Sequence, residues 1–190
     1  MNPRTLARLL LGGAMAAESG LAVRRFEARR RAYQAAVRRA SEAGRPLIVV
    51  GDPDAGAHTR LVRAYGCGDL CIDLNGCPLC KVMQVADLAA GPVPNVSDDT
   101  AVVFVSCVLE YIADAAAAVR ELRRMAGSPE NLFTVSVQPW TLTAALYPGA
   151  RWTAVRDADE MRLTPVSPPQ KALAVGTLAG LLAAACWPRS

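Results

Sequence analysis

The sequence predicts an α/β protein built around a doubly wound, mostly parallel sheet. Two apolar runs, residues 47–50 and 101–106, have the near-continuous hydrophobicity of strands that are buried on both faces. The first run ends abruptly in a turn of glycine, aspartate and proline, and strand and helix patterns then alternate as far as Pro139. This alternation argues for parallel strands joined by right-handed crossovers.

Length and composition divide the chain into one domain and two terminal appendages. The chain has 190 residues, and its hydrophobic fraction of 52% owes much to alanine and to apolar segments near both ends. We expect a helical, basic N-terminal extension over residues 1–45, an α/β domain over 46–170, and an apolar C-terminal helix over 171–190.

The first apolar segment, residues 6–17, leaves three interpretations open. Arg4 precedes this segment and Arg8 lies near its start, and no acidic residue occurs before Glu18. A targeting presequence has this composition. A helix on a membrane surface, with its arginines at the lipid headgroups, is the second interpretation, and a helix packed on the domain is the third.

The positive charge of the protein is concentrated in residues 21–45. Eight arginines accompany two glutamates there, a local balance of +6 against a net charge of +4 for the whole chain. Such a stretch is usually the solvated face of a helix. An anionic membrane surface or a nucleic acid is the alternative partner.

The elements of the domain follow from its apolar periodicity. Five strands are expected, at Leu47–Val50, Leu70–Leu74, Val82–Val85, Ala101–Ser106 and Leu132–Val137. A helix over Ala57–Tyr65 is expected to end at Gly66. Beyond the fifth strand, Arg151–Val155 and Met161–Val166 are expected to add two more strands.

The clearest helix of the chain follows Asp114. Asp114 is a good N-cap, and apolar residues recur after it at helical spacing. Arginines at 120, 123 and 124 lie toward the C-terminal end, where their positive charges interact favourably with the helix dipole. Gly127 and Pro129 then end the helix.

The second apolar segment, residues 172–187, contains sixteen uncharged residues. A membrane span needs about 17–25 residues, so this length is borderline. Gly176 and Gly180 form a G-x-x-x-G pattern, which lets two helices approach closely in lipid. A membrane anchor and an alanine-rich helix that covers the sheet are the two interpretations.

Four of the six cysteines lie within fourteen residues, at positions 67, 71, 77 and 80. Cys77 and Cys80 have the spacing at which two thiolates hold one zinc ion, and Cys67 is the expected third ligand, with Cys71 in the core. Buried small hydrophobic residues and a redox C-x-x-C are the alternatives. No clear export signal is evident, which favours a reducing, intracellular compartment and argues against a disulfide framework.

The segment Val96–Val137 resembles class I S-adenosylmethionine-dependent methyltransferases. It carries, in the order typical of that family, an acidic turn, a strand, a small-residue segment, a capped helix with a basic pair, and a further strand. These features are Asp98–Asp99, Ala101–Ser106, Ser106–Glu110, Asp114–Arg124 and Asn131–Val137. The resemblance covers residues 46–139 and rests on ordered agreement.

The resemblance implies a Rossmann-like methyltransferase fold with S-adenosylmethionine as cofactor. The family's cofactor contacts then fall on a set of turn and strand-end residues, namely Gly51, Asp52, Gly56, Asp73, Asp87, Ser106 and Glu110. The amides of the Gly51–Gly56 loop would face the methionine end, with Asp52 attracting its sulfonium or amine. Asp73 would accept hydrogen bonds from both ribose hydroxyls, and Asp87 would contact the adenine amino group. Ser106 to Glu110 would line the floor near the transferred methyl group.

Two functions follow from these expectations. The first is an S-adenosylmethionine-dependent methyltransferase-like protein that acts on an unidentified acceptor. The alternative is a non-catalytic structural or assembly subunit of a larger or membrane-associated complex, because the family's G-x-G-x-G turn keeps only two glycines here and Pro53 donates no N–H. A weaker third hypothesis is a nucleic-acid-associated factor that works through Arg24–Arg39.

Overall fold

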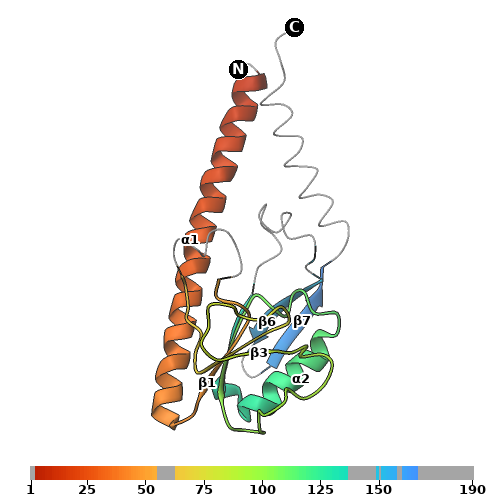
Figure 1. Ribbon diagram of the computed structural model, residues 1–190. Helices are drawn as coiled ribbons and strands as arrows, with labels where there is room; N and C mark the ends of the chain where they lie inside the picture. The colour runs from red at the N-terminus through yellow and green to blue at the C-terminus, as the bar shows by residue number, and fades with distance from the viewer. Residues whose placement is uncertain (1–2, 55–62, 137–148, 150, 158–159, 167–190) are drawn as a thin grey trace.

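The computed structural model describes residues 3–54, 63–136, 149, 151–157 and 160–166, and its elements are drawn in Figure 1. They are, in chain order, α1 (Pro3–Ala43), β1 (Leu47–Val50), β2 (Leu70–Asp73), β3 (Met83–Val85), β4 (Val102–Ser106), α2 (Ala115–Ala126), the 3₁₀ turn η1 (Pro129–Asn131), β5 (Leu132–Val135), β6 (Trp152–Asp157) and β7 (Glu160–Pro165).

Five parallel strands form the central sheet, in the order β3-β2-β1-β4-β5. This is the order of doubly wound sheets, in which the direction of winding reverses between the first and fourth strands. The predicted α/β class and parallel sheet are therefore confirmed. The expected strands agree with the observed ones to within two residues at each end.

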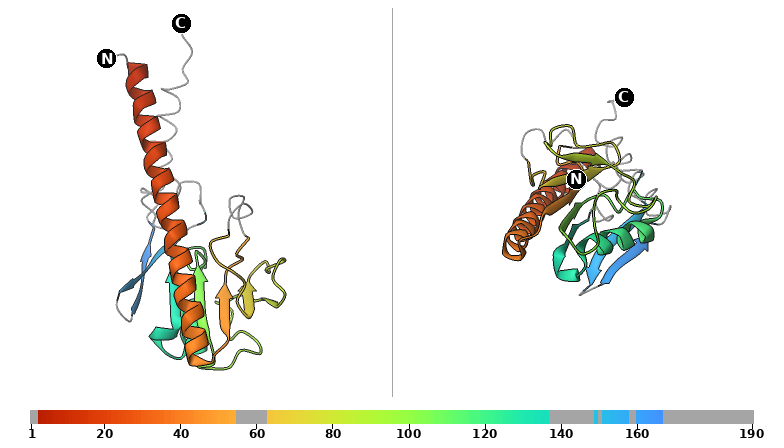
Figure 2. Two further views of the ribbon diagram at one scale, coloured as in Figure 1. Left: turned by 90° about the vertical axis from the view of Figure 1, so that its left-hand side faces the viewer. Right: turned by 60° about the horizontal axis from the view of Figure 1, so that its bottom comes forward.

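The sheet is covered on both faces because the side chains of its central strands alternate. Leu47 and Val49 pack with the C-terminal half of α1, while Ile48 and Val50 pack with α2. Figure 2 shows the two helices on opposite sides of the sheet. Every residue of β1 and β4 is buried, as the continuous apolar runs predict.

A single continuous helix, α1, occupies almost all of the expected N-terminal extension. Its C-terminal half is part of the domain: Ala36 and Ala40 are buried, and the Tyr33 ring stacks edge-on against Phe104 with centroids 5.4 Å apart. α1 runs antiparallel to the strands, so its N-terminal half extends past their carboxyl ends (Figures 1 and 2).

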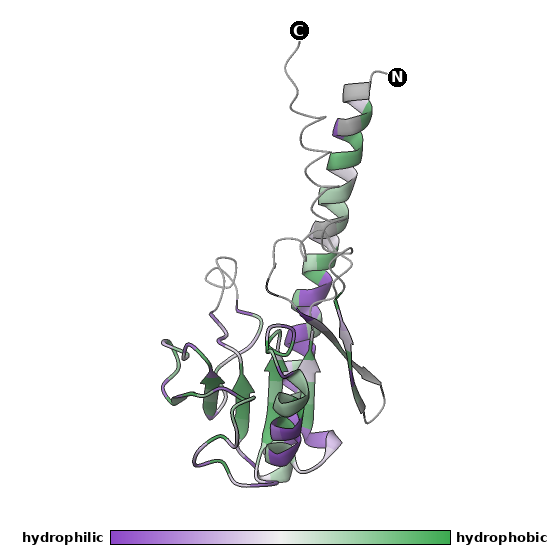
Figure 3. Cartoon of the chain, turned by 90° about the vertical axis from the view of Figure 1, so that its right-hand side faces the viewer, coloured by the Kyte–Doolittle hydropathy of each residue, from purple (hydrophilic) through white to green (hydrophobic). Residues whose placement is uncertain are grey.

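The extending half of α1 exposes apolar side chains, among them Leu9 and Met15 at 62% and 64% (Figure 3). Residues 6–17 thus stand clear of the sheet, whereas the basic stretch overlaps the part of α1 that packs on it. Among the described residues, no helix has both the length and the hydropathy needed to cross a membrane. Residues 172–187 lie outside the described part of the chain.

α2 begins and ends where the sequence predicts. The Asp114 carboxylate accepts the Ala117 N–H at 2.9 Å, and the Gly127 N–H donates to the Arg123 carbonyl at 2.8 Å with φ of 69° at the glycine. Leu122 and Met125 are fully buried against the sheet. Local capping signals therefore account for both ends of this helix.

The helix expected over Ala57–Tyr65 does not reach its predicted end. Arg63–Tyr65 are not helical, and the rest of that prediction lies outside the described residues. Tyr65 instead packs against Phe104, with ring centroids 5.1 Å apart, and its hydroxyl donates to the Asp52 carbonyl at 3.3 Å. The tertiary contacts of one aromatic ring thus outweigh the local helical pattern.

β6 and β7 form an antiparallel hairpin in a sheet of their own. The two strands are confirmed, and they extend further toward each other than expected because Asp157 pairs with Glu160. The hairpin is tied to the loop after β4: the Glu110 carbonyl accepts the Arg151 N–H at 2.6 Å, and Trp152 Nε1 donates to the Ile112 carbonyl at 2.9 Å.

A buried carboxylate, Glu121, joins α2 to the loop before β4. It accepts hydrogen bonds from the Val93 N–H at 2.8 Å and from Arg124 at 2.6 and 2.7 Å. Burial by itself would raise the pKa of Glu121, but the hydrogen bonds from Arg124 and Val93 outweigh it and lower the pKa.

We expect Glu121→Gln to lower the free energy of unfolding by about 2 kcal/mol at neutral pH, the scale of a hydrogen bond to a charged group. A carboxylate whose pKa is lowered by folding stabilises above its unfolded pKa, and this contribution is lost as the pH falls through the folded value. The deficit should therefore shrink at strongly acidic pH in urea unfolding. Glu130→Gln, at an exposed ion pair, is the control, and a pH-independent deficit would contradict the assignment.

Candidate functional site

A cleft of about 440 Å³ opens at the carboxyl ends of β1 and β2. Residues at the ends of these strands, the loop after β3 and the loop after β4 line it. Two carboxylates, Asp73 and Asp87, lie on its wall, and Val50, Leu88 and Val108 supply apolar surface. Small ligands of doubly wound sheets bind at this edge, beside the point where the winding reverses.

Asp73 ends β2 and is half-buried. One carboxylate oxygen accepts the Asp52 N–H at 3.2 Å, and the other accepts the Asn75 N–H at 2.8 Å. These two bonds fix the orientation of the carboxylate. Because an ionised carboxylate has about four acceptor positions, Asp73 keeps the capacity to accept two further hydrogen bonds.

Asp87 follows β3 and is exposed. Its side chain accepts the Ala89 N–H at 2.9 Å, and its carbonyl accepts the Ala90 N–H at 3.1 Å. The residue therefore shapes a turn and also presents a carboxylate to the cleft. The structure brings Asp73 and Asp87 together at one cleft.

Gly51 makes the turn after β1 with φ of +101°. A Cβ there would lie 2.7 Å from Val108 Cγ2 and 3.0 Å from the Ser106 carbonyl. Glycine is therefore required, and the close approach that requires it is to the end of β4 and to Val108, which packs directly against the Gly51 turn.

Asp52 and Asp54 continue this turn. The Asp52 carboxylate accepts the Asp54 N–H at 3.0 Å, and Asp54 forms a two-pronged ion pair with Arg63, in which Nε lies 2.6 Å from Oδ1. Arg63 thus neutralises one of the two negative charges. Gly56, the other glycine of the predicted loop, lies outside the described residues.

Ser106 and Glu110 are buried rather than presented to the cleft. Ser106 is 5% exposed and Glu110 is 1% exposed, and neither belongs to the described residues that line the cleft. Ser106 forms a hydrogen bond with Tyr65, although burial still raises the pKa of Tyr65 to about 12. Cys107 and Val108, which lie between Ser106 and Glu110 in the chain, line the cleft where Ser106 and Glu110 were expected.

Cys107 also lines the cleft, and sequence reasoning assigned it no role of its own. It follows β4 with φ of +55°, and its Sγ accepts a hydrogen bond from Arg29 Nη2 at 2.8 Å. Burial raises the pKa of the Cys107 thiol, and the Arg29 guanidinium opposes that rise. Its place directly after a buried strand was visible in the sequence, whereas a partner 78 residues away was not.

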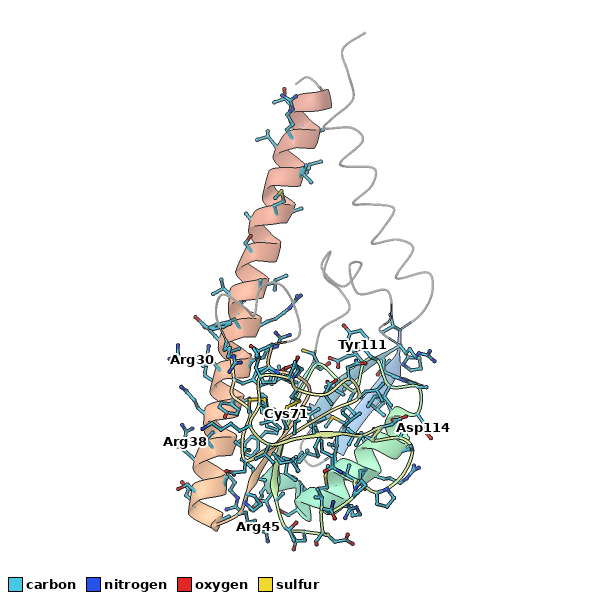
Figure 4. The ribbon with its side chains drawn as sticks, viewed as in Figure 1. Arg30, Arg38, Arg45, Cys71, Tyr111 and Asp114 are labelled. Carbon is cyan, nitrogen blue, oxygen red and sulfur yellow. A yellow bond between two sulfur atoms is a disulfide. The ribbon has the colours of Figure 1, made fainter. Side chains whose placement is uncertain are left out.

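The cysteine cluster, Cys67, Cys71, Cys77 and Cys80, lies on the α1 face of the sheet (Cys71 is labelled in Figure 4). Two disulfides join Cys67 to Cys80 and Cys71 to Cys77, which differs from the thiols expected of a reducing compartment. The sulfurs of Cys71, Cys77 and Cys80 lie within 4.8 Å of one another, so as thiols this buried group could hold a metal ion.

The three-cysteine group differs from the predicted ligand set of Cys67, Cys77 and Cys80. It contains Cys71 in place of Cys67. The reason is that alternation in β2 turns Cys71 toward the α1 face, and the loop from Leu74 to Val82 folds back onto that same face. The position of Cys71 within a strand predicted that it would be buried in the core. In the structure it is buried beside the sulfurs of the other cysteines.

A scan against protein-family models and searches of the curated proteins and of the solved structures found no match for this chain.

We expect Cys107 to be alkylated slowly at neutral pH, with a rate that rises only above the ordinary thiol pKa. Arg29→Gln removes the group that lowers this pKa, so the pH dependence of the rate should move further upward. The measurement is iodoacetamide labelling of the oxidised protein in a Cys186→Ser background. Arg30→Gln is the control, since Arg30 lies on the outer side of α1 (Figure 4) and should leave the profile unchanged. A profile equally displaced in both variants would contradict the Arg29 contact.

Proposed function

We propose that this chain is an S-adenosylmethionine-dependent methyltransferase-like protein that acts on an unidentified acceptor. One observation carries the proposal: Asp73 and Asp87, from two adjacent strand ends, line a single cleft at the carboxyl edge of a 3-2-1-4-5 parallel sheet. The sequence resemblance of residues 46–139 supports the same assignment.

The cleft suits an adenosine group. Asp73 would accept hydrogen bonds from the ribose hydroxyls with its two remaining acceptor positions, and charge-assisted bonds of this kind are the stronger class. Asp87 would accept a hydrogen bond from the adenine amino group. Val50 and Val108 supply apolar surface for the purine ring.

Methyl transfer makes small demands on protein acid–base chemistry. The cofactor supplies an activated sulfonium methyl group, and alignment of the acceptor provides much of the acceleration. In this chain the loop after β4, with Cys107 and Val108, would set the distance between an acceptor and the adenosine cleft.

The alternative function is a non-catalytic structural or assembly subunit. It is favoured by Val108, which fills the space in front of Gly51, and by the apolar half of α1 that extends past the sheet. For this function we propose an intracellular protein complex or an anionic membrane surface as partner. Arg30 and Arg38, on the outer side of α1 (Figure 4), make nucleic acid the third candidate, whose binding would fall steeply with salt.

For the reduced cysteine cluster we propose zinc as the metal. Thiolate ligands favour zinc, and four zinc–sulfur bonds of about 2.3 Å are typical of structural sites. Binding would release the thiol protons to solvent as the sulfurs coordinate. Cys67 would be the fourth ligand beside Cys71, Cys77 and Cys80.

The proposed cofactor is tested by calorimetric titration of S-adenosylmethionine and S-adenosylhomocysteine into the full chain. We expect saturable binding, and we expect Asp73→Asn to weaken it about tenfold to hundredfold, because a charged hydrogen-bond acceptor is lost. The control is Glu42→Gln, which removes an exposed carboxylate at the opposite end of the sheet. Binding unaffected by Asp73→Asn would contradict the ribose assignment, and a folded chain that binds neither compound would favour the structural subunit.

Zinc binding is tested by metal analysis of protein that has been reduced, loaded with zinc and dialysed. We expect a single ion per chain, lost in Cys77→Ser and Cys80→Ser and retained in Cys107→Ser, whose thiol lies outside the cluster. Loss of zinc in Cys71→Ser would distinguish the group of Cys71, Cys77 and Cys80 from the predicted set of Cys67, Cys77 and Cys80, in which Cys71 is not a ligand. Reduced, folded protein that retains no zinc would exclude the site.

A further inference from the structure

Asp73 lies inside a small covalent ring. The disulfide from Cys71 to Cys77 has a sequence separation of 6, so it encloses Asp73 and the turn that follows it. Both cysteines are fully buried, whereas Leu74, within the ring, is 63% exposed. One side of the ring is therefore anchored in the core, and the other side stands in solvent.

Hydrogen bonds also hold this turn. Among the described residues, the Asn75 N–H donates to the Asp73 carboxylate at 2.8 Å, and the Gly76 and Ala86 N–H groups donate to the Asp73 carbonyl at 3.3 Å. Beyond the turn the chain joins β3, an edge strand of three residues. Hydrogen bonds at the exposed end of a short edge strand open readily, and the cross-link is a covalent restraint on the turn that remains when they open.

The ring also reaches the two neighbouring strands. Cys71 Sγ lies 3.9 Å from the Gly51 carbonyl, in the turn after β1, and the Cys77 N–H donates to Met83 Sδ in β3 at 3.4 Å. The Asp52 N–H, next to Gly51, donates to the Asp73 carboxylate. The sulfur pair is thus linked to both of the chain segments that flank Asp73.

We propose that Cys71 and Cys77 are positioning residues for Asp73, and that their cross-link sets the affinity of the cleft for adenosine-containing ligands. This inference rests on the proposed function. Either a disulfide or a shared metal ion would supply the cross-link, because both hold the two sulfurs together. Without it the turn samples more conformations, and a ligand that needs one of them binds more weakly in proportion to the competent fraction.

The cross-link is opened by a dithiol reductant. The S–S bond breaks, each cysteine sulfur gains one electron and one proton, and the reductant leaves as its own cyclic disulfide. A chelator then keeps the thiols free of metal. Loading with zinc restores a link between the same sulfurs without reoxidation.

The test is titration of S-adenosylhomocysteine into the full chain in three forms: oxidised, reduced and metal-free, and reduced with zinc. We expect affinity about tenfold lower in the reduced, metal-free form, which corresponds to a competent fraction of about one tenth. The oxidised Cys71→Ser/Cys77→Ser variant should match that form. The control is Cys67→Ser/Cys80→Ser, which removes the other disulfide and keeps the ring around Asp73.

Hydrogen exchange of the Asn75 and Gly76 amides, measured without ligand, gives a second readout that does not depend on cofactor binding. We expect both amides to exchange faster once the ring is open and to be protected again by zinc. Equal affinity and equal exchange in all three forms would overturn the positioning role. If no form binds S-adenosylhomocysteine, the proposed function and the affinity claim fail together, and the exchange rates alone decide whether the cross-link holds Asp73.

Discussion

The parallel pairing of β1 with β4, buried on both faces, is the constraint on which the rest of the structure depends. A strand buried on both sides needs a cover on each, and α1 and α2 provide these covers on opposite faces of the sheet. Packing of α1 fixes the C-terminal half of a 41-residue helix against Phe104 and Val49. Loops surround the carboxyl ends of the strands, and the cleft forms there.

Two residues at the carboxyl edge of the sheet have unusual backbone conformations. Gly51 and Cys107 both have positive φ, and they follow neighbouring parallel strands. Glycine adopts a positive φ without strain. A cysteine with a positive φ has a higher conformational free energy, which tertiary contacts must offset. The contacts from Arg29 and Ser106 to the Cys107 sulfur are of that kind, so α1 supports the edge as well as the core.

Local signals in the sequence account for most of the fold and for part of the site. The apolar runs at 47–50 and 101–106 and the N-cap at Asp114 are signals that span only a few residues. Each of them forms the expected element. The positions of Asp73 at the end of a strand and of Asp87 just after one were predictable because a strand end is a local feature. The contact of Arg29 with Cys107 spans 78 residues, and the folding of the cysteine loop onto the same face as Cys71 depends on tertiary packing, so neither follows from periodicity.

Because of the direction of α1, the two proposed functions make different demands on the same edge of the molecule. Because α1 is antiparallel to the strands, its apolar N-terminal half extends past the carboxyl edge of the sheet (Figures 1 and 3). The cleft lined by Asp73 and Asp87 opens at this same edge. A methyltransferase needs this edge open to cofactor and acceptor. A structural subunit needs the exposed leucines of α1 covered by a partner, which would then stand over the cleft. Ligand affinity of the free chain therefore bears on both functions, since a partner that covers α1 would change access to Asp73 as well.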